Sequence, residues 1–249
     1  TKIEIYADHN MIALICGTGS FPKEIFKILN KKKIKYIIIN LTDKKLSKLE
    51  IKLKIGQFGK LFKTLKENSC KEVIFAGKIL RPSLQNIKFD TEGLKILPAL
   101  YKVFKKGDYK ILNFIVKLLK KKNIKTISHT KYCKALTLYS NPTSYKPTTT
   151  NMADLKIAIN LFNKFKNHDL GQSIIVDKCR IIGVEGAFGT DQIINNYKKF
   201  NKTRKKNTGI LVKIPKKNQD FEIDLPTIGY KTIKNCISAG LAGIYLKKG

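Results

Sequence analysis

The residues best suited to chemistry are concentrated in one segment, which contains Lys213, Lys216, Asp224, Pro226 and Thr227. Proline holds the residue before it in an extended conformation, so Asp224 is expected to project from a stiff loop, and Thr227 is placed to cap the helix that follows. A carboxylate beside exposed helix N–H groups could bind a metal ion or orient a water molecule, while the lysines hold phosphate charge. The alternative is that Asp224 only serves a turn before the helix, and spacing alone favours this alternative.

Two further carboxylates flank a glycine-rich turn. Glu185 lies at the end of a predicted strand, and Asp191 follows the turn. Oxygen ligands in this arrangement are suited to magnesium. The alternative is that Thr190 or Asp191 caps the next helix, and both interpretations can hold together.

A glycine-containing loop follows the apolar run over residues 11–16, which has the length of a strand. Backbone N–H groups and a helix N-terminus at this position favour an anion, so the loop could contact a nucleotide or a phosphate. A tight strand-to-helix turn without a ligand explains the glycines about as well. The loop residues are Gly17, Thr18, Gly19 and Ser20.

Lys78 and Arg81 follow another predicted strand, over residues 72–76. Ligands of parallel α/β sheets bind beyond the carboxyl ends of the strands, so these two cations could hold phosphate. The alternative is a solvated loop in a lysine-rich chain. Arg81 is the stronger candidate for phosphate binding, because only three of the 50 basic residues are arginine.

The elements that must position these residues alternate between strands and helices, which is typical of an α/β protein with a parallel sheet. Apolar spacing predicts strands over residues 11–16, 34–39, 72–76 and 124–127, with helices over 58–65, 94–104 and 111–119. In a second, smaller α/β domain it predicts strands over 173–176, 181–185, 209–213 and 242–246, with helices over 155–165, 191–197 and 228–237. Residues 140–150, rich in proline and threonine, form the predicted linker between domains over 11–139 and 151–249.

Composition excludes several classes of protein. The hydrophobic content of 43% supports packed cores, and five cysteines without a Cys-x-x-Cys motif argue against a disulfide framework or a thiolate zinc site. There is no signal-peptide pattern and no apolar run long enough to span a bilayer, so we expect a cytosolic protein. The net charge of +32 comes from lysine spread through every segment, which does not favour a nucleic-acid binder. The three histidines of the chain are isolated from one another in sequence, which argues against a histidine-rich two-metal phosphoesterase.

Taken together, these segments resemble the LpxI family, the UDP-2,3-diacylglucosamine pyrophosphatases of bacterial lipid A synthesis. The resemblance is carried by Leu-Ile-Cys-Gly-Thr-Gly-Ser-Phe-Pro over residues 14–22, Gly-Gln-Phe-Gly-Lys-Leu-Phe-Lys over 56–63, Phe-Ala-Gly-Lys over 75–78, Gly-Thr-Asp over 189–191, Lys-Ile-Pro-Lys over 213–216, Asp-Leu-Pro-Thr-Ile-Gly over 224–229 and Ala-Gly-Leu-Ala-Gly over 239–243. Each motif is weak alone, but their order and spacing over the whole chain are specific.

The resemblance implies a Rossmann-like parallel-sheet domain followed by a smaller α/β domain, with the active site between them. It implies magnesium-dependent hydrolysis of a lipid-linked UDP-sugar, giving 2,3-diacylglucosamine 1-phosphate and UMP, with an essential Asp224. A homodimer at the inner face of the cytoplasmic membrane is also implied. On this basis, Asp224, Asp191 and Lys213 are the expected catalytic residues, and Asp224, Asp191 and Glu185 the expected metal ligands. The expected substrate-binding residues are Gly17, Thr18, Gly19, Ser20, Lys78, Arg81, Thr190, Lys216 and Thr227.

The chain departs from the family pattern in several places. Phe188 stands where the family commonly has a glutamate, and Thr18 stands where a third consecutive glycine is usual. Residues 1–10 are expected to be an upstream extension, and relatives continue past Gly249. The rival hypotheses are a non-hydrolytic nucleotide- or dinucleotide-binding module that uses the Gly17–Gly19 loop, and a charge-driven nucleic-acid binder.

Overall fold

The computed structural model describes residues 11–79, 81–105, 107–138, 142–165, 171–202, 207–215 and 226–247. The chain divides into two compact units, Thr1–Thr137 and Leu138–Gly249. Residues 142–148 form neither helix nor strand, and the first helix of the second unit begins at Thr149.

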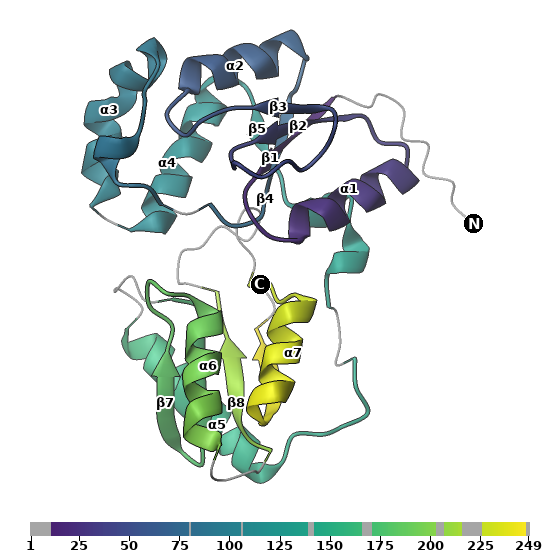
Figure 1. Ribbon diagram of the computed structural model, residues 1–249, viewed down its shortest axis with the longest axis vertical. Helices are drawn as coiled ribbons and strands as arrows, with labels where there is room; N and C mark the ends of the chain where they lie inside the picture. Colours follow the sequence, from purple (N-terminus) through teal and green to yellow (C-terminus); the bar gives the residue numbers. More distant parts are fainter. Residues whose placement is uncertain are drawn as a thin grey trace. The chain divides into compact units, whose positions relative to one another are not determined.

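The first unit is built on a five-stranded parallel sheet with the strand order β3-β2-β1-β4-β5 (Figure 1). Its strands are β1 (Ile12–Cys16), β2 (Tyr36–Asn40), β3 (Glu50–Lys52), β4 (Glu72–Ala76) and β5 (Lys125–Thr126). All five residues of β1 are buried, as expected for the central strand of a sheet that is covered on both faces. The predicted parallel sheet is thus confirmed.

Helices cover both faces of this sheet because successive residues of a strand point to opposite sides. On one face, α1 (Phe21–Lys31) packs Ile25 and Leu29 against Leu14. On the other face, α2 (Phe58–Glu67) and α4 (Asp108–Lys121) pack against Ala13 and Ile15. The remaining described elements of the unit are α3 (Thr91–Phe104) and three 3-10 turns, η1 (Leu84–Asn86), η2 (His129–Lys131) and η3 (Lys134–Leu136).

The second unit contains a four-stranded mixed sheet with the order β7-β6-β8-β9. Its strands are β6 (Ser173–Asp177), β7 (Arg180–Val184), β8 (Thr208–Lys213) and β9 (Leu241–Leu246). Strand β6 is antiparallel to both neighbours, whereas β8 and β9 are parallel. The unit is therefore α/β with a mixed sheet, in agreement with the predicted smaller α/β domain.

In the described part of the second unit, three helices cover this sheet. One face packs against α5 (Thr149–Lys164), and the other packs against α6 (Thr190–Asn201) and α7 (Tyr230–Ala239), which lie side by side (Figure 1). The prediction that Thr227 caps the last helix was wrong, because α7 begins at Tyr230 and its N-cap is Gly229. Glycine suits this position because an N-cap residue leaves the helical conformation.

No helix among the described residues combines the length and the apolar content that crossing a bilayer requires.

Candidate functional site

Strand pairing in the second unit brings two polar side chains together where the two central strands, β6 and β8, begin and end. Ser173 begins β6 and lies in register with Lys213, which ends β8. Two residues further into these strands, Ile175 and Leu211 belong to the core beneath α6 and α7. Because side chains alternate along a strand, Ser173 and Lys213 face the same side as α6.

Glu185 and Thr190 reach the same end of the sheet from the adjacent strand and helix. Glu185 follows β7 directly, and its backbone N–H donates to the carbonyl of Ser173 at 2.8 Å. Thr190 is the first residue of α6, whose N-cap is Gly189 in a left-handed conformation with φ of 81°. The helix has no side-chain cap, so the hydroxyl of Thr190 does not serve the helix terminus.

The Thr190 hydroxyl is instead the centre of a polar network. It donates to Glu185 Oε1 at 3.0 Å, accepts from Lys213 Nζ at 3.0 Å and lies 3.0 Å from Ser173 Oγ. Ser173 is fully buried, and the other three residues are half-buried. We refer to Ser173, Glu185, Thr190 and Lys213 as the Thr190 network.

Glu185 is also held from its other side. Its Oε2 accepts the backbone N–H of Gln172 at 3.0 Å, so each carboxylate oxygen has a protein donor. The backbone N–H of Gly171 donates to the carbonyl of Glu185 at 2.8 Å. A Cβ at Gly171 would collide with the Glu185 side chain, so this close approach requires glycine. The position of the Glu185 carboxylate is therefore fixed by the fold.

Asp191 points to a different element. Its Oδ2 forms an ion pair with Lys231 Nζ at 3.1 Å, and its Oδ1 accepts from Asn235 Nδ2 at 3.4 Å. Both partners are on α7, so Asp191 links the first turn of α6 to the first two turns of α7. Among the described residues there is no group of three or more His, Cys, Asp or Glu side chains that could hold a metal ion.

The glycine loop of the first unit is joined to the loop that follows β4. Thr18 N–H donates to the Lys78 carbonyl at 2.7 Å, and Lys78 N–H donates to the Thr18 carbonyl at 3.0 Å. The Thr18 hydroxyl also donates to the Lys78 carbonyl, at 2.9 Å. Because a Cβ at Gly17 would collide with this same carbonyl, Gly17 is required by the crossing of the two loops. The N–H and hydroxyl of Thr18 are thus used within the protein.

Arg81 is engaged at the junction of α3 and α4. Its guanidinium donates to the Phe104 carbonyl at 2.6 Å and to Asp108 Oδ1 at 3.2 Å, and it lies 4.2 Å from the centroid of the Phe104 ring. This set of contacts uses both the planar fork and the face of the guanidinium. Arg81 therefore joins three parts of the first unit.

Comparison with known proteins decides the family. Residues 11–136 match the model of the LpxI N-terminal domain, and residues 140–249 match that of the LpxI C-terminal domain. The chain belongs to the LpxI family. It is 30% identical over 247 residues to the UDP-2,3-diacylglucosamine pyrophosphatase LpxI of Caulobacter vibrioides, an alignment that covers 96% of this chain and 88% of that protein.

Among solved structures, the chain is similar to a crystal structure of N5-carboxyaminoimidazole synthase from Aspergillus clavatus in complex with ADP and 5-aminoimadazole ribonucleotide. The match has 10% identity and a TM-score of 0.25, and it covers 75% of this chain and 43% of that one. A likeness this low carries no argument about site or function.

The structure describes all but two of the expected LpxI site residues. It brings Glu185, Thr190 and Lys213 together, and it places the Lys78 backbone against Thr18. Asp224 and Lys216 lie outside the described residues, and Thr227 is exposed three residues before α7. Phe188, the departure from the family pattern, is 87% exposed, so its ring contributes no packing around the Thr190 network.

Sequence reasoning missed Ser173, which the structure places in the Thr190 network. A serine at the first position of a short apolar strand gives no chemical signal of its own. The available signal was its register opposite Lys213, which depends on knowing that β6 pairs with β8 in antiparallel orientation.

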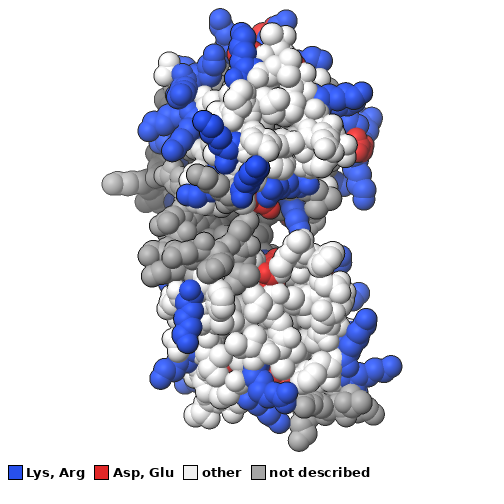
Figure 2. Space-filling view, turned by 90° about the vertical axis from the view of Figure 1, so that its left-hand side faces the viewer, with Lys and Arg blue, Asp and Glu red and all other residues white. Residues whose placement is uncertain are grey.

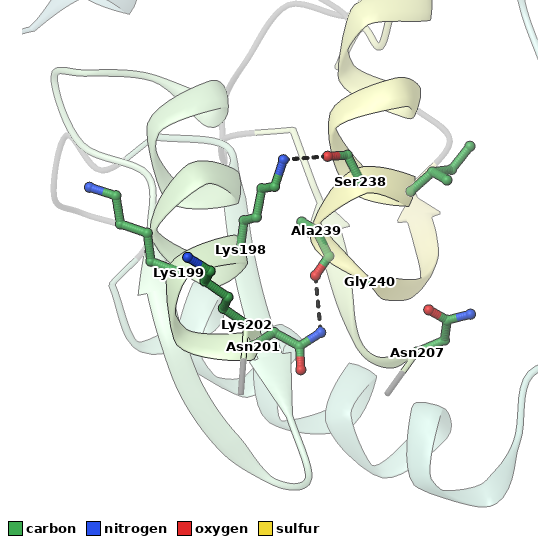
Figure 3. Close-up of a pocket in the computed structure, with 9 residues that line it drawn as sticks. Lys198, Lys199, Asn201, Lys202, Asn207, Ser238, Ala239 and Gly240 are labelled. Atoms are coloured by element: carbon green, nitrogen blue, oxygen red, sulfur yellow. Dashed lines mark hydrogen bonds between the residues drawn. The ribbon is translucent and has the colours of Figure 1, made fainter. Parts of the chain in front are cut away.

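Lysines line a separate pocket of about 480 Å³ at the C-terminal ends of α6 and α7 (Figure 3). Lys198 there donates to Ser238 Oγ at 2.6 Å, and Asn201 Nδ2 donates to the Ala239 carbonyl at 3.0 Å. The Thr190 network lies at the opposite, N-terminal end of α6. Lysine side chains are distributed over the visible surface of both units (Figure 2), so a lysine-lined hollow is expected in this chain without a ligand.

Proposed function

We propose that this chain hydrolyses the diphosphate of UDP-2,3-diacylglucosamine to 2,3-diacylglucosamine 1-phosphate and UMP, as a step of lipid A synthesis. The observation that carries the proposal is the match to both LpxI domains in order, together with a relative of that name aligned over 96% of the chain. The geometry supports it, because diphosphate hydrolysis needs fixed positive charge for the phosphate oxygens and a held water molecule.

The second unit supplies fixed positive charge at the end of β8. Lys213 is anchored beside the first turn of α6, where the helix dipole also favours an anion. We assign Lys213 to the phosphate oxygens and Asp224 to the attacking water. Lys216 and Thr227, which flank Asp224 in sequence, are proposed to contact the same phosphate region.

Magnesium is proposed as the cofactor, with Asp224 and Asp191 as protein ligands. Asp191 fits this role, because its partner Lys231 is 80% exposed and such an ion pair is weak. Glu185 fits less well, because both of its oxygens already accept hydrogen bonds. Magnesium is commonly held by one or two carboxylates together with substrate phosphates and water, and it neutralises phosphate charge when bound.

A mass-resolved assay of the purified full chain tests this function. With magnesium present, the lipid nucleotide should be converted to UMP and the sugar 1-phosphate, and EDTA should stop the conversion. Asp224→Asn should lower kcat by about a hundredfold or more, whereas Glu67→Gln, at an exposed carboxylate of α2, should leave it unchanged. An intact substrate with folded protein would refute the function, and full activity of Asp224→Asn would refute its catalytic role.

In the first unit, the proposed nucleotide contacts are Gly19, Ser20 and the Lys78 side chain. Gly17, Thr18 and Arg81 are less suited, because their donors already bind protein groups; the Gly17 N–H, for example, donates to the Ala76 carbonyl at 2.8 Å. A nucleotide-binding module without hydrolysis remains the rival function. Thermal stabilisation by NAD, with none by the lipid nucleotide, would favour that rival.

We further propose a cytoplasmic homodimer that touches the inner face of the membrane. The support for membrane contact is α7, which exposes Tyr230 at 80% and Ile237 at 72% beside Lys231 and Lys234. Apolar side chains flanked by lysine suit an anionic lipid surface. Sedimentation with anionic vesicles tests the contact, and light scattering tests the dimer.

A further inference from the structure

We infer that Ser173, Thr190 and Glu185 are positioning residues for the ammonium group of Lys213, and that Lys213 alone among these four contacts phosphate. The inference rests on the proposed function only in taking the phosphate to be that of the substrate. It assigns a role to Ser173, and it changes the expected role of Glu185 from metal ligand to fixed counter-charge.

The number of donors and acceptors on each side chain assigns a direction to every hydrogen bond of the Thr190 network. A lysine ammonium can only donate, an ionised carboxylate can only accept, and a hydroxyl has one hydrogen and two acceptor sites. Thr190 accepts from Lys213 and donates to Glu185, so its single hydrogen is used. Ser173 must then be the donor in the 3.0 Å contact with Thr190 Oγ1. The Thr190 hydroxyl thus makes one donated and two accepted bonds, which is its full capacity.

This arrangement couples the Lys213 charge to the Glu185 charge through one hydroxyl. The carboxylate polarises the Thr190 O–H bond, which makes the threonine oxygen a better acceptor for the ammonium group. Hydrogen bonds with an ionised partner are shorter and stronger than neutral ones. A lysine side chain has large rotamer freedom, and the network restricts it before a ligand arrives.

Backbone contacts fix the other end of the network. Glu185 receives the Gln172 N–H on Oε2, and Glu185 N–H donates to the Ser173 carbonyl. Ser173 and Lys213 are held in register by neighbouring strands. Ser173, Glu185 and Thr190 are therefore positioned by β6, by the end of β7 and by the start of α6.

A pair of variants at Thr190 tests the inference. Thr190→Val keeps the side-chain shape but removes the hydroxyl, and it should lower kcat/KM by about tenfold to a hundredfold. Thr190→Ser keeps the hydroxyl and should stay within about threefold of the parent chain. If the valine variant is as active as the parent, or if serine and valine lose activity equally while remaining folded, the inference is wrong.

A double-mutant cycle separates positioning from direct substrate contact. If Thr190 acts through Lys213, adding Thr190→Val to a Lys213→Met chain should change kcat/KM by less than about threefold, because the partner is already absent. The same cycle with Ser173→Ala, and with Glu185→Gln, should also be non-additive. Fully additive losses would show that these side chains act on the substrate independently, which overturns the inference.

Calorimetric titration with inorganic pyrophosphate keeps this test distinct from that of the proposed function. A chain that binds pyrophosphate, with affinity lowered by Thr190→Val and preserved by Thr190→Ser, supports the Lys213 network even if the lipid nucleotide is not hydrolysed. Equal affinity in the parent and Thr190→Val chains, or no binding together with additive kinetic losses, would refute it.

Discussion

At the scale of single residues, Glu185 and Asp191 show how surroundings decide what a carboxylate can do. Both flank the same turn in sequence, six residues apart. Glu185 accepts a backbone N–H and a threonine hydroxyl, whereas Asp191 pairs with an exposed lysine of α7. An exposed pair is easily exchanged for another cation, while a carboxylate held by two fixed donors is not. This contrast makes Asp191 the better candidate for a metal ligand and Glu185 the better anchor.

Buried thiols give a residue-scale prediction about pH. Burial raises the pKa of Cys70 from 9.0 to about 11. Burial with the Asp191 charge raises the pKa of Cys236 to about 11, and burial with the Glu50 charge raises the pKa of Cys16 to about 12. Because the unfolded thiols ionise first, stability should be full below pH 9 and fall as the pH rises from 9 towards 11.

Denaturant unfolding at pH 8, 9 and 10 measures this effect. Cys70→Ala should reduce the slope of unfolding free energy against pH by up to about 1.4 kcal/mol per pH unit. Cys179→Ala, at the exposed cysteine, is the matched control and should leave the slope unchanged. An unchanged slope in Cys70→Ala would contradict the raised thiol pKa.

At the scale of elements, the loops after β1 and β4 owe their shape to each other. The Thr18–Lys78 bridge brings the two backbones so close that Gly17 and Gly77 face a carbonyl of the opposite loop. Gly77 also has φ of 87°, and a Cβ there would lie 2.6 Å from the Thr18 carbonyl oxygen. These glycines therefore serve loop packing whether or not a nucleotide binds.

Gly17→Ala should lower the unfolding free energy by about 2 kcal/mol or more, because the added methyl group forces the Lys78 backbone to move. Gly186→Ala is the matched control, since a Cβ there meets nothing within 4 Å and should change stability by less than about 0.5 kcal/mol. Urea denaturation of both variants measures the difference. Equal stability of the two would show that the loops separate without cost.

Arg81 gives a second prediction at this scale. Arg81→Lys loses the bidentate fork and the stacking on Phe104, and it should lower the unfolding free energy by about 1–2 kcal/mol. KM should change by less than about twofold. The control is Arg180→Lys, at an exposed arginine of β7, which should leave both quantities unchanged. A large rise in KM without a loss of stability would restore the phosphate-binding role predicted from the sequence.

At the scale of the whole molecule, the dominant property is a net charge of +32 on 249 residues. Such a charge destabilises the compact state through self-repulsion and attracts anionic surfaces and substrates. The lysines are not gathered over one element, and the visible surface of each unit carries them (Figure 2). The charge therefore acts on stability and on encounter with substrate, rather than defining a binding site.

Screening of this charge should raise the melting temperature. Raising sodium chloride from 10 mM to 300 mM shortens the Debye length from about 30 Å to below about 10 Å, so the Tm should increase by several degrees. Exchanging the exposed residues Lys44 and Lys45 for glutamate should raise the Tm at low salt and have little effect at high salt. Calorimetry in both buffers measures this, and a Tm independent of salt would show that self-repulsion is negligible.

The sequence by itself determined the family, the alternation of strands and helices and the parallel sheet of the first unit, because apolar periodicity and ordered motifs are local properties of the chain. It also selected Glu185, Thr190 and Lys213 as candidates. It could not determine the strand pairing that places Ser173 opposite Lys213, or the contacts that turn Arg81 towards Phe104 and Asp108.

Those features depend on residues far apart in sequence, and only the tertiary structure decided them. Thr190 is 17 residues from Ser173 and 23 from Lys213, so no local pattern reports their meeting. Sheet register and the start of α6 bring the three side chains within hydrogen-bond distance. The role of a polar residue then follows from which of its donors and acceptors the fold has already used, and that is known only once the chain is folded.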